Sequence, residues 1–266
     1  MRIASWNVNS LRVRLPHVLD WLARARPAVL GLQETKLIDE KFPRAELEAA
    51  GYHVAFAGQP TYNGVALLAD QAHFAQPEDI TVNNPLFPDE QVRLIAATLT
   101  PLTAGKSLRF ICGYIPNGSE VGSEKYDYKL RWLDAAARWL EKELQQHTHL
   151  ALVGDFNIAP QDQDVHDPQA WNEKILCSTA ERARLTKLLA LGLQDAFRLF
   201  DQPAGQYSWW DYREAAFRRN RGLRIDLVLL SQALASSCLA SGIDTAPRKL
   251  EKPSDHAPVW AELDWQ

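Results

Sequence analysis

Polar side chains able to take part in chemistry follow the short apolar runs of this sequence. Asn7 follows the run 2–6, Glu34 follows 28–33, and Tyr114 closes 108–114. Strand ends of packed sheets share a rim, and loops held by such a scaffold commonly carry catalytic and binding groups. A lone Asn or Asp at a strand end more often caps a turn, so the prediction rests on the whole set. That set comprises Asn7, Glu34, Tyr114, Asp155, Asn157, Asp226, Asp255 and His256.

The donor types in this set favour a hard divalent cation. Carboxylate and amide oxygens with one imidazole suit Mg²⁺ or Mn²⁺, whereas zinc sites contain more His or Cys. Glu34 follows a fully apolar run, and a carboxylate near a core must be paired or bound to a metal. Clustered carboxylates repel anions unless a cation bridges them, and phosphate is the anion usually held that way. The set therefore predicts a metal-dependent site for a phosphate-bearing substrate.

A basic segment with interleaved aromatic residues points to a polyanionic substrate. Between residues 213 and 224, five arginines stand against one acid, which leaves a local charge of +4 in a chain of net charge −4. Stacking combined with positive charge is typical of nucleic-acid contacts. Two structural explanations without any role in binding stay open: the arginines form a solvated, salt-bridged surface, and the tryptophans belong to the core. The residues concerned are Tyr207, Trp209, Trp210, Tyr212, Arg213, Phe217, Arg218, Arg219, Arg221 and Arg224.

The elements that must position these residues are short strands, some consecutive and some separated by helices. That order favours a mixed sheet arrangement over a strictly parallel one. Helices are predicted over 128–146, from the capping box at Ser178 to Gly192, and over 15–25 with Pro16 near the first turn. No repeat or linker-like tract interrupts the chain, so one catalytic domain over 1–266 is the simpler reading. The predicted strands are 2–6, 28–33, 53–57, 64–69, 92–100, 108–114, 150–154, 224–231 and 259–263.

Composition excludes several classes of protein. The 266 residues are 46% hydrophobic and 23% charged, which is too apolar for a disordered chain. A net charge of −4 argues against a generic nucleic-acid coat protein. Three widely spaced cysteines without a CxxC pair indicate reduced thiols, and the sequence has neither a secretory signal nor an apolar run of about 18 residues. We therefore expect a cytoplasmic protein without a membrane-spanning helix.

Six motifs occur in the order and spacing of the exonuclease III family. Each alone is weak to moderate evidence, whereas all six in order are very specific. From Met1 to about Trp265 the chain resembles the bacterial exonuclease III type of apurinic/apyrimidinic (AP) endonuclease. The motifs are Ser5-Trp6-Asn7-Val8-Asn9-Ser10-Leu11-Arg12, Leu32-Gln33-Glu34-Thr35-Lys36, Asn63-Gly64-Val65-Ala66, Gly154-Asp155-Phe156-Asn157-Ile158-Ala159-Pro160, Gly222-Leu223-Arg224-Ile225-Asp226 and Ser254-Asp255-His256-Ala257-Pro258.

The resemblance implies a fold and an activity. The fold is a four-layered α/β sandwich, in which two packed mixed β-sheets are flanked by helices. The activity is Mg²⁺-dependent hydrolysis of DNA on the 5′ side of abasic sites, with 3′–5′ exonuclease and 3′-end-cleaning activity in base excision repair. The implied partner is double-stranded DNA with abasic sites or blocked 3′ ends, bound by a monomer.

The resemblance also implies the metal ligands. Glu34 would be the principal ligand of Mg²⁺, with Asn7 and Asp255 nearby; the donor types leave Mn²⁺ open as the alternative. The implied metal-binding set is Asn7, Glu34, Asp155, Asn157, Asp255 and His256.

Catalytic roles follow in the same way. Asp155 would orient or deprotonate the attacking water, and Asn157 would contact the phosphate. His256, held by Asp226, would bind or polarise a phosphate oxygen. Tyr114 would lie beside the scissile phosphate, and whether Asp155 or Tyr114 handles the leaving-group proton stays open. The implied catalytic set is Tyr114, Asp155, Asn157, Asp226 and His256.

Substrate contacts complete the expectation. Asn117 would support Tyr114, and Trp209, Leu223 and Ile225 would line the pocket for an extruded abasic sugar. Some relatives place a tryptophan where Leu223 stands, which leaves the ratio of endonuclease to exonuclease activity open. The sequence is also compatible with a different phosphodiesterase on this scaffold and with a catalytically weak DNA-binding module. The residues predicted to contact DNA phosphates are Arg213, Arg218 and Arg221.

Overall fold

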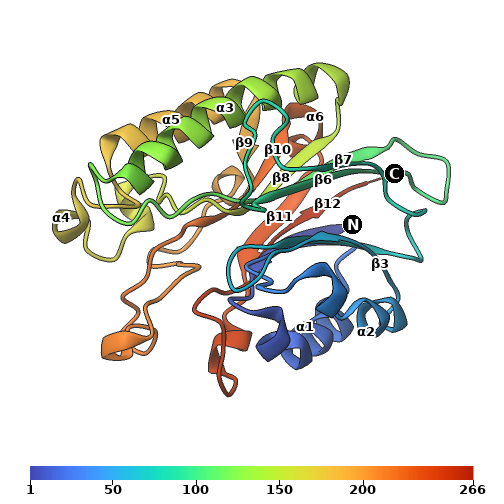
Figure 1. Ribbon diagram of the computed structural model, residues 1–266, viewed down its shortest axis with the longest axis horizontal. Helices are drawn as coiled ribbons and strands as arrows, with labels where there is room; N and C mark the ends of the chain where they lie inside the picture. Colours follow the sequence, from blue (N-terminus) through green and yellow to red (C-terminus); the bar gives the residue numbers. More distant parts are fainter. Residues whose placement is uncertain (266) are drawn as a thin grey trace.

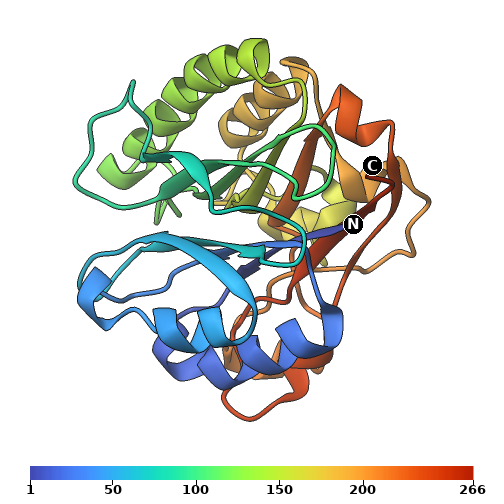
Figure 2. The ribbon, with the colours of Figure 1, turned by 90° about the vertical axis from the view of Figure 1, so that its right-hand side faces the viewer.

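Two six-stranded β-sheets pack face to face and helices cover both outer faces, which makes four layers (Figure 1). This computed structural model describes residues 1–265. The first sheet has the order β11-β12-β1-β2-β4-β3 and the second β5-β6-β7-β8-β10-β9. Figure 2 shows the two sheets edge-on between the helical layers. The four-layered sandwich expected from the family resemblance is confirmed.

The strands are short, and most are buried on both faces. The first sheet contains β1 (Arg2–Asn7), β2 (Val29–Gln33), β3 (Tyr52–Ala57), β4 (Val65–Asp70), β11 (Cys238–Ile243) and β12 (Val259–Leu263). The second contains β5 (Glu78–Val82), β6 (Leu94–Leu99), β7 (Leu108–Tyr114), β8 (Leu150–Asp155), β9 (Leu193–Asp195) and β10 (Asp226–Ser231). Every residue of β2, β8 and β10 is buried. Strands covered on both faces need continuous apolar runs rather than alternation, and this is the pattern that the sequence shows.

Pairing within the sheets is mixed, as the sequence predicted. The pairs β1–β2 and β7–β8 are parallel, and the other pairs are antiparallel. Each parallel pair is joined by a helix that crosses an outer face. The helices are α1 (Leu11–Ala25), α2 (Arg44–Ala49), α3 (Glu124–Gln146), α4 (Pro168–Trp171), α5 (Thr179–Ala190) and α6 (Gln232–Ala235).

Three apolar layers hold the sandwich together. Between the sheets, Ile3 and Val29 belong to the same buried cluster as Phe110 and Val153. A second cluster joins α3 and α5 to the outer face of the second sheet, and a third joins α1 to the first sheet around Trp6. Burial of side chains of this size contributes about 1.5–3 kcal/mol each. The strands β1, β2, β7 and β8 therefore lie between apolar layers on both of their faces.

Gly154 lets the strands β7 and β8 approach closely beside the site. It pairs in register with Gly113, and a Cβ at position 154 would lie 1.9 Å from the carbonyl oxygen of Gly113. That separation is far inside the van der Waals limit, so any side chain here would push the strands apart. The residue after this glycine is Asp155, whose position depends on the close approach.

Several sequence predictions need correction. The helix predicted from Leu15 begins at Leu11, whose backbone N–H donates to the carbonyl of Thr35 at 3.1 Å, so Pro16 lies inside the helix. Arg12 and Arg14 are polar and the apolar Val13 is exposed, so the first turn shows no apolar face that periodicity could detect. Three strands and three helices were not predicted. Strand β5 is largely exposed, β11 is only partly buried, and β9, α2, α4 and α6 are very short.

Other predictions hold. Ser178 caps α5, since its Oγ accepts from the backbone N–H of Glu181 and the Glu181 carboxylate accepts from that of Ser178. The three cysteines are free, two of them buried. Among the helices that the structure describes, none combines the length and apolar character needed to cross a bilayer.

Candidate active site

Strand direction brings the predicted residues to one rim of the sandwich. Asn7 ends β1 and Glu34 follows the parallel strand β2, so both lie at the same edge of the first sheet. Tyr114 and Asp155 end the parallel strands β7 and β8 of the second sheet and are register partners. Asp226 begins the antiparallel strand β10 and pairs with Asp155. The two sheets therefore present their functional side chains to the same space.

His256 reaches this rim from the antiparallel strand β12. Residues just before β12 lie at the end of β1 that carries Asn7, because Ser5 pairs with Val259. Ser254 fastens this segment: its Oγ donates to the carbonyl of Asn7 at 2.7 Å and accepts from the N–H of His256 at 3.2 Å. The imidazole is thus placed by residues almost 250 positions away in the chain.

Asn7 holds two carboxylates together at the centre of the site. Its Nδ2 donates to Glu34 Oε1 at 2.8 Å and to Asp155 Oδ2 at 2.9 Å. Glu34 has a left-handed backbone, φ 53°, in a turn held by the N–H of Ser10, which donates to the Glu34 carbonyl at 2.8 Å. Such a conformation is unfavourable for a residue with a side chain and persists only where the surroundings impose it.

A buried chain of charges links Asp226, His256 and Asp155. Nδ1 of His256 lies 2.8 Å from Asp226 Oδ2, and Nε2 lies 3.7 Å from Asp155 Oδ2. Burial lowers the pKa of His256, but Asp226 and Asp155 outweigh this and raise it well above its usual range. Burial raises the pKa of Asp155, the His256 imidazolium opposes the rise, and Asp226 adds to it. The geometry therefore favours a protonated imidazole with its Nε2 facing the site.

Ser208 positions the Asp226 end of this chain. Its Oγ accepts from the backbone N–H groups of Ile225 and Asp226, both at 3.0 Å. This serine was not predicted from the sequence, because a serine between aromatic residues carries no signal of its own.

The loop after β8 is held by amide side chains. Asp155 Oδ1 accepts from the N–H of Asn157 at 2.9 Å, and Asn157 Nδ2 donates to the carbonyl of Ile115 at 3.0 Å. Asn117 was expected to support Tyr114. Its Nδ2 instead donates to Asn157 Oδ1 at 3.0 Å, since the chain turns toward the β8 loop after Pro116.

Tyr114 lies at the junction of the two sheets. Burial raises the pKa of its phenol well above the usual range, and the charges of Glu34 and Asp155 raise it further. The guanidinium of Arg93 stacks over its ring at 5.0 Å from the centroid. The phenol therefore stays neutral and keeps its O–H for donation.

Asp255 is joined to Glu34 through two residues that were not predicted as site residues. Its Oδ1 accepts from Asn9 Nδ2 at 2.9 Å and its Oδ2 from Trp209 Nε1 at 3.0 Å. Lys36 Nζ donates to Asn9 Oδ1 at 2.6 Å and lies 2.9 Å from Glu34 Oε2. The only signal for Asn9 and Lys36 was their place within two residues of Asn7 and Glu34.

The three residues expected to line a sugar pocket do lie together. Trp209 forms isolated β-bridges with both Leu223 and His256, and its indole N–H donates to Asp255 Oδ2 at 3.0 Å, which places the ring beside the site. Leu223 and Ile225 are 0% and 1% exposed and pack with the apolar side chains of Ala159, Val165, Leu176 and Cys177.

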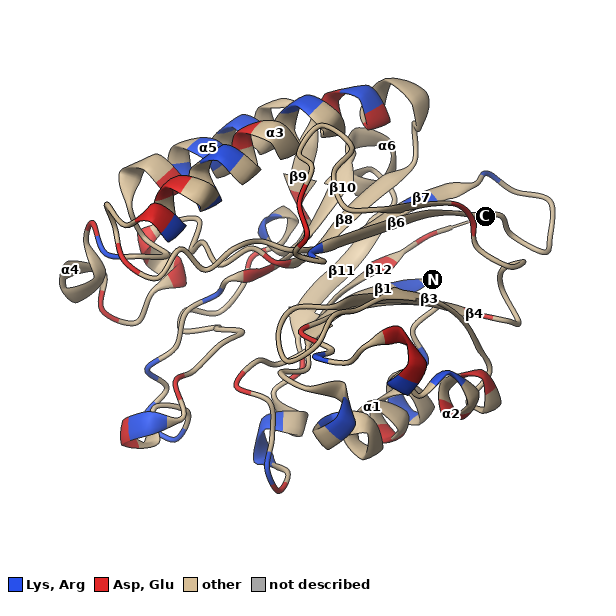
Figure 3. Ribbon diagram, viewed as in Figure 1, with Lys and Arg blue, Asp and Glu red and all other residues tan. Residues whose placement is uncertain are grey.

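The basic segment divides into an exposed and a buried part. Arg213, Arg218 and Arg221 are exposed on a loop that projects at the lower left of Figure 3. Arg224 was counted with them, but it is 1% exposed and pairs with Asp164 and Asp195, both at 2.7 Å. Its charge is neutralised inside the protein, so the expectation of a surface arginine at this position is wrong.

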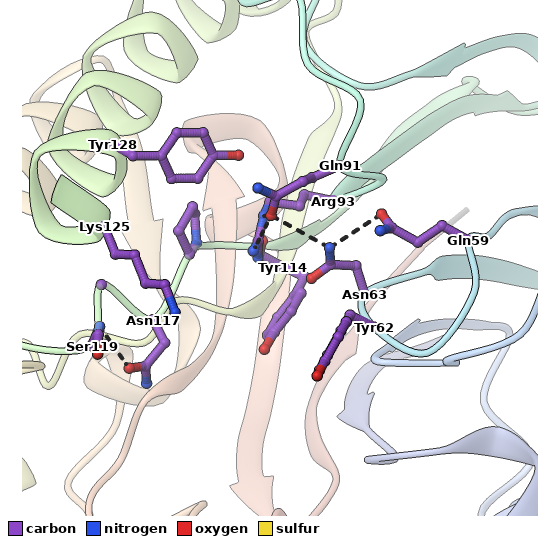
Figure 4. Close-up of a pocket in the computed structure, with 12 residues that line it drawn as sticks. Gln59, Tyr62, Asn63, Gln91, Arg93, Tyr114, Asn117, Ser119, Lys125 and Tyr128 are labelled. Atoms are coloured by element: carbon purple, nitrogen blue, oxygen red, sulfur yellow. Dashed lines mark hydrogen bonds between the residues drawn. The ribbon is translucent and has the colours of Figure 1, made fainter.

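A polar cleft of about 520 Å³ opens beside Tyr114 (Figure 4). Loops of both sheets form it. Asn63, from the loop before β4, donates to Gln59 at 3.1 Å, and Arg93 donates to Gln91 at 2.7 Å. The other lining residues are Tyr62, Pro116, Asn117, Gly118, Ser119, Lys125 and Tyr128.

The donor set at the centre fits a divalent cation. Glu34, Asp155 and His256 each offer a ligand atom, and these atoms lie within 4.8 Å of one another. Like charges this close need a cation or hydrogen-bond donors between them. Oxygen-rich sites with a single imidazole suit Mg²⁺ or Mn²⁺ better than zinc. Together, the two-sheet fold and this site define the class of metal-dependent phosphoesterases.

Comparison with known proteins agrees with that class. The model of the endonuclease/exonuclease/phosphatase family matches residues 4–256. The chain belongs to this family and, within it, to the exonuclease III type. It is 40% identical to exodeoxyribonuclease III of Haemophilus influenzae over 272 residues, which cover 99% of this chain and 100% of that protein. It is 32% identical to the exodeoxyribonuclease of Bacillus subtilis over 97% of this chain and 98% of that protein.

Solved structures show the same fold. The 3′ phosphatase NExo from Neisseria, in a variant bound to a product DNA hairpin, superposes with a TM-score of 0.93 at 45% identity, over 100% of both chains. An AP endonuclease from Archaeoglobus fulgidus superposes with a TM-score of 0.91 at 37% identity, over 99% of both chains.

Proposed function

We propose that this protein hydrolyses the DNA backbone on the 5′ side of abasic sites and removes blocking groups from 3′ ends. It is a nuclease that acts on DNA phosphodiester bonds, as the exonuclease III relatives indicate. The observation that carries the assignment is the convergence of Glu34, Asp155 and His256 within 4.8 Å, braced by Asn7 and Asp226. We place the reaction in the cytoplasm, where free thiols persist, and assign it to a monomer with one catalytic domain.

Glu34 and Asp155 are the proposed ligands of Mg²⁺. In this assignment His256 acts on the phosphate, so the two carboxylates and the neighbouring amide and carboxylate oxygens of Asn7, Asn157 and Asp255 are the proposed donors to the metal. Mg²⁺ held by these residues would supply positive charge against the charge that develops on the phosphate and on the departing 3′ oxygen.

The protein's own groups carry the proton transfers. Asp155 accepts a proton from the attacking water, and the departing 3′ oxygen takes up a proton from Asp155 or from Tyr114. The positive charge of His256 opposes the effect of burial, which raises the pKa of Asp155. His256 Nε2 donates to a non-bridging phosphate oxygen while Asp226 fixes the ring through Nδ1. The neutral phenol of Tyr114 donates to the phosphate from the side of the second sheet, and Asn157 is the second donor there.

Recognition of the lesion requires no reading of bases. An abasic nucleotide has lost its stacking, so its extrusion costs less than the flipping of a normal base. Trp209 lies next to His256 and is the proposed platform for the extruded sugar. Arg213, Arg218 and Arg221 are exposed and are the proposed phosphate contacts of the flanking duplex.

The test is a gel assay on end-labelled duplexes. One duplex carries a tetrahydrofuran abasic analogue, one a 3′-phosphate at a nick, and one is undamaged. With Mg²⁺ we expect incision 5′ to the analogue and release of the phosphate, and with EDTA neither. Cleavage that ignores the lesion, or that persists in EDTA, would refute the proposal.

A second candidate is 3′-end cleaning without incision at abasic sites. Leu223 and Ile225 are almost fully buried and packed, so they leave little room for an extruded sugar. The structurally similar NExo from Neisseria is described as a 3′ phosphatase. Phosphate release from the nicked duplex without incision of the abasic duplex would favour this candidate.

A further inference from the structure

The buried ammonium of Lys129 contacts two loops at the site, the loop after β7 with Asn117 and the loop after β8 with Asn157. Lys129 is on α3 and pairs with Glu181 in the first turn of α5, and both residues are 0% exposed. Removing two charges from water is costly, and a buried ion pair often adds nothing to stability compared with apolar residues of the same size. A role in positioning therefore explains the pair better than a role in stability.

All three N–H groups of the ammonium have separate acceptors. Lys129 Nζ donates to the carbonyl of Asn117 at 3.1 Å, to the carbonyl of Asn157 at 2.6 Å and to the Glu181 carboxylate. An ammonium has three donors, so none is left over. One acceptor lies after β7, one after β8 and one on α5. A single atom thus sets the distance between two loops and a helix.

Glu181 is itself held firmly, so it serves as a fixed anchor. Its Oε1 accepts from the N–H of Leu176 at 3.1 Å, and its Oε2 accepts from the Oγ of Ser178 at 2.6 Å. The hydroxyl of Tyr126, on the same helix as Lys129, lies 2.7 Å from that Oγ.

Gly118 closes the loop over the lysine side chain. Its φ of 89° lies in the region that favours glycine, and a Cβ there would lie 3.1 Å from Lys129 Cδ and 2.9 Å from Ile175 Cδ1. The loop after β7 therefore packs against the aliphatic part of the Lys129 side chain and also accepts a hydrogen bond from its ammonium.

The two carbonyls belong to residues that hold the site. Asn157 has a left-handed backbone with φ 49°, and its N–H donates to Asp155 Oδ1 at 2.9 Å. Asn117 Nδ2 donates to Asn157 Oδ1 at 3.0 Å. An unfavourable backbone of this kind persists where neighbouring groups over-determine it, and the bond from Lys129 is one of those groups.

We infer that Lys129, anchored on Glu181, is a positioning residue that holds residues 115–118 and 155–159 in the arrangement that aims Asp155 and Asn157 at the phosphate. The inference rests on the proposed function of those two residues. Lys129 acts through backbone carbonyls, so its effect is on the precision of the site. Misplacement of a reacting group by about 1 Å costs about 10²-fold in rate.

The experiment replaces the whole ion pair. Lys129→Met with Glu181→Gln removes both charges and leaves neither partner uncompensated. The matched control is Arg109→Met with Glu143→Gln, because that pair is also buried, also involves α3, and joins Arg109 Nε to Glu143 Oε2 at 2.7 Å. Arg109 stands at the opposite end of β7 from Tyr114. The Tm of both double variants is measured, so that their kcat values are compared at known stability.

Only the Lys129 variant should lose turnover. On the nicked 3′-phosphate and abasic duplexes, we expect kcat to fall about 10- to 100-fold with KM within about threefold of the wild type. The control should keep kcat within about threefold. An equal fall in kcat in both variants would overturn the inference, because loss of stability would then explain it.

Hydrogen exchange supplies a readout that does not depend on activity. Amides of 115–118 and 155–159 should exchange faster in the Lys129 and Glu181 double variant than in the wild type or the control, all measured without metal. If hydrogen exchange of these amides is unchanged in the double variant, the inference is overturned. It is also overturned if the amides exchange faster while kcat stays at the wild-type value. If the wild type cleaves none of the duplexes, the proposed function fails, while the exchange data still decide whether Lys129 orders the loops.

Lys129→Arg covers the case in which the double variant does not fold. The guanidinium keeps a positive charge beside Glu181, but its planar fork cannot place three N–H groups on these three acceptors. We expect a comparable loss of kcat. Wild-type kcat in this variant would overturn the inference.

Discussion

Replacing Asp226 with asparagine tests the proposed role of His256 most directly. In the wild type, Nδ1 of His256 lies 2.8 Å from Asp226 Oδ2, and both side chains are buried. Burial lowers the pKa of His256, but Asp226 and Asp155 together raise it to about 10. Removing one adjacent carboxylate changes such a pKa by about 1–3 pH units, each equivalent to about 1.4 kcal/mol. We expect the pKa of His256 to fall by this amount in Asp226→Asn.

The kcat of Asp226→Asn should also fall. The imidazole loses the partner that orients it, so its Nε2 donor to the phosphate is misplaced, and loss of one such donor costs about 10²- to 10³-fold in kcat. Titration of the His256 ring by NMR in metal-free protein measures the pKa, and cleavage of end-labelled DNA at saturation measures kcat. Asp70→Asn is the control, because Asp70 lies 2.9 Å from the exposed imidazole of His73, away from the site, and should leave kcat unchanged.

The result that refutes this reasoning is a lowered pKa with wild-type kcat. It would show that turnover does not need Asp226 to orient and charge His256. A stability measurement adds an independent check. The folded pKa of His256, about 10, lies above the ordinary 6.5, so its stabilisation is complete below pH 6.5 and is lost as the pH rises toward 10. The free energy of unfolding of metal-free wild type, measured in urea, should fall over this range more steeply than that of Asp226→Asn.

Three further perturbations test other parts of the structure. Glu34→Gln should lower kcat at least about 10²-fold and abolish the rise in Tm that Mg²⁺ produces in wild type; an unchanged metal-dependent rise would remove Glu34 from the ligand set. Changing Arg213, Arg218 and Arg221 together to alanine should weaken DNA binding and reduce the slope of log K against log salt by up to about 3; an unchanged slope would mean that these arginines do not contact phosphates. Gly154→Ala should destabilise the protein by several kcal/mol in thermal or urea unfolding, on the order of the larger point-mutant effects, since its Cβ would lie 1.9 Å from a carbonyl oxygen; stability like that of wild type would contradict the close approach of β7 and β8.

Much of the architecture was readable from local patterns. Strands buried on both faces produce continuous apolar runs, which is why β2, β7 and β8 were predicted within about one residue. Strand β12 alternates between buried and partly exposed residues and was also predicted. The capping box at Ser178 marked the start of α5, because it depends on residues three apart. Exposed strands such as β5 have no such pattern and were missed.

The centre of the site was also foreseeable, because each functional residue follows or begins a recognisable buried strand. Asn7, Glu34, Asp155 and Asp226 are in such places, and parallel or antiparallel pairing then brings them to one rim. The side-chain partners of Asn117 were not foreseeable. Its contact with Asn157 depends on how two loops pass each other, and nothing within a few residues of either asparagine encodes this.

The burial of charged residues is the feature that could least be predicted from local sequence. Arg224 lies in a run of arginines that reads as a basic surface, and Lys129 lies in a helix with many charges, yet both are buried. Each charge is tolerated inside only because the chain returns an acid to it from far away: Asp164, 60 residues from Arg224, and Glu181, 52 residues from Lys129. The spacing of apolar residues predicts which strands and helices are buried. Whether a charged side chain is buried depends on partners that only the folded chain brings close to it.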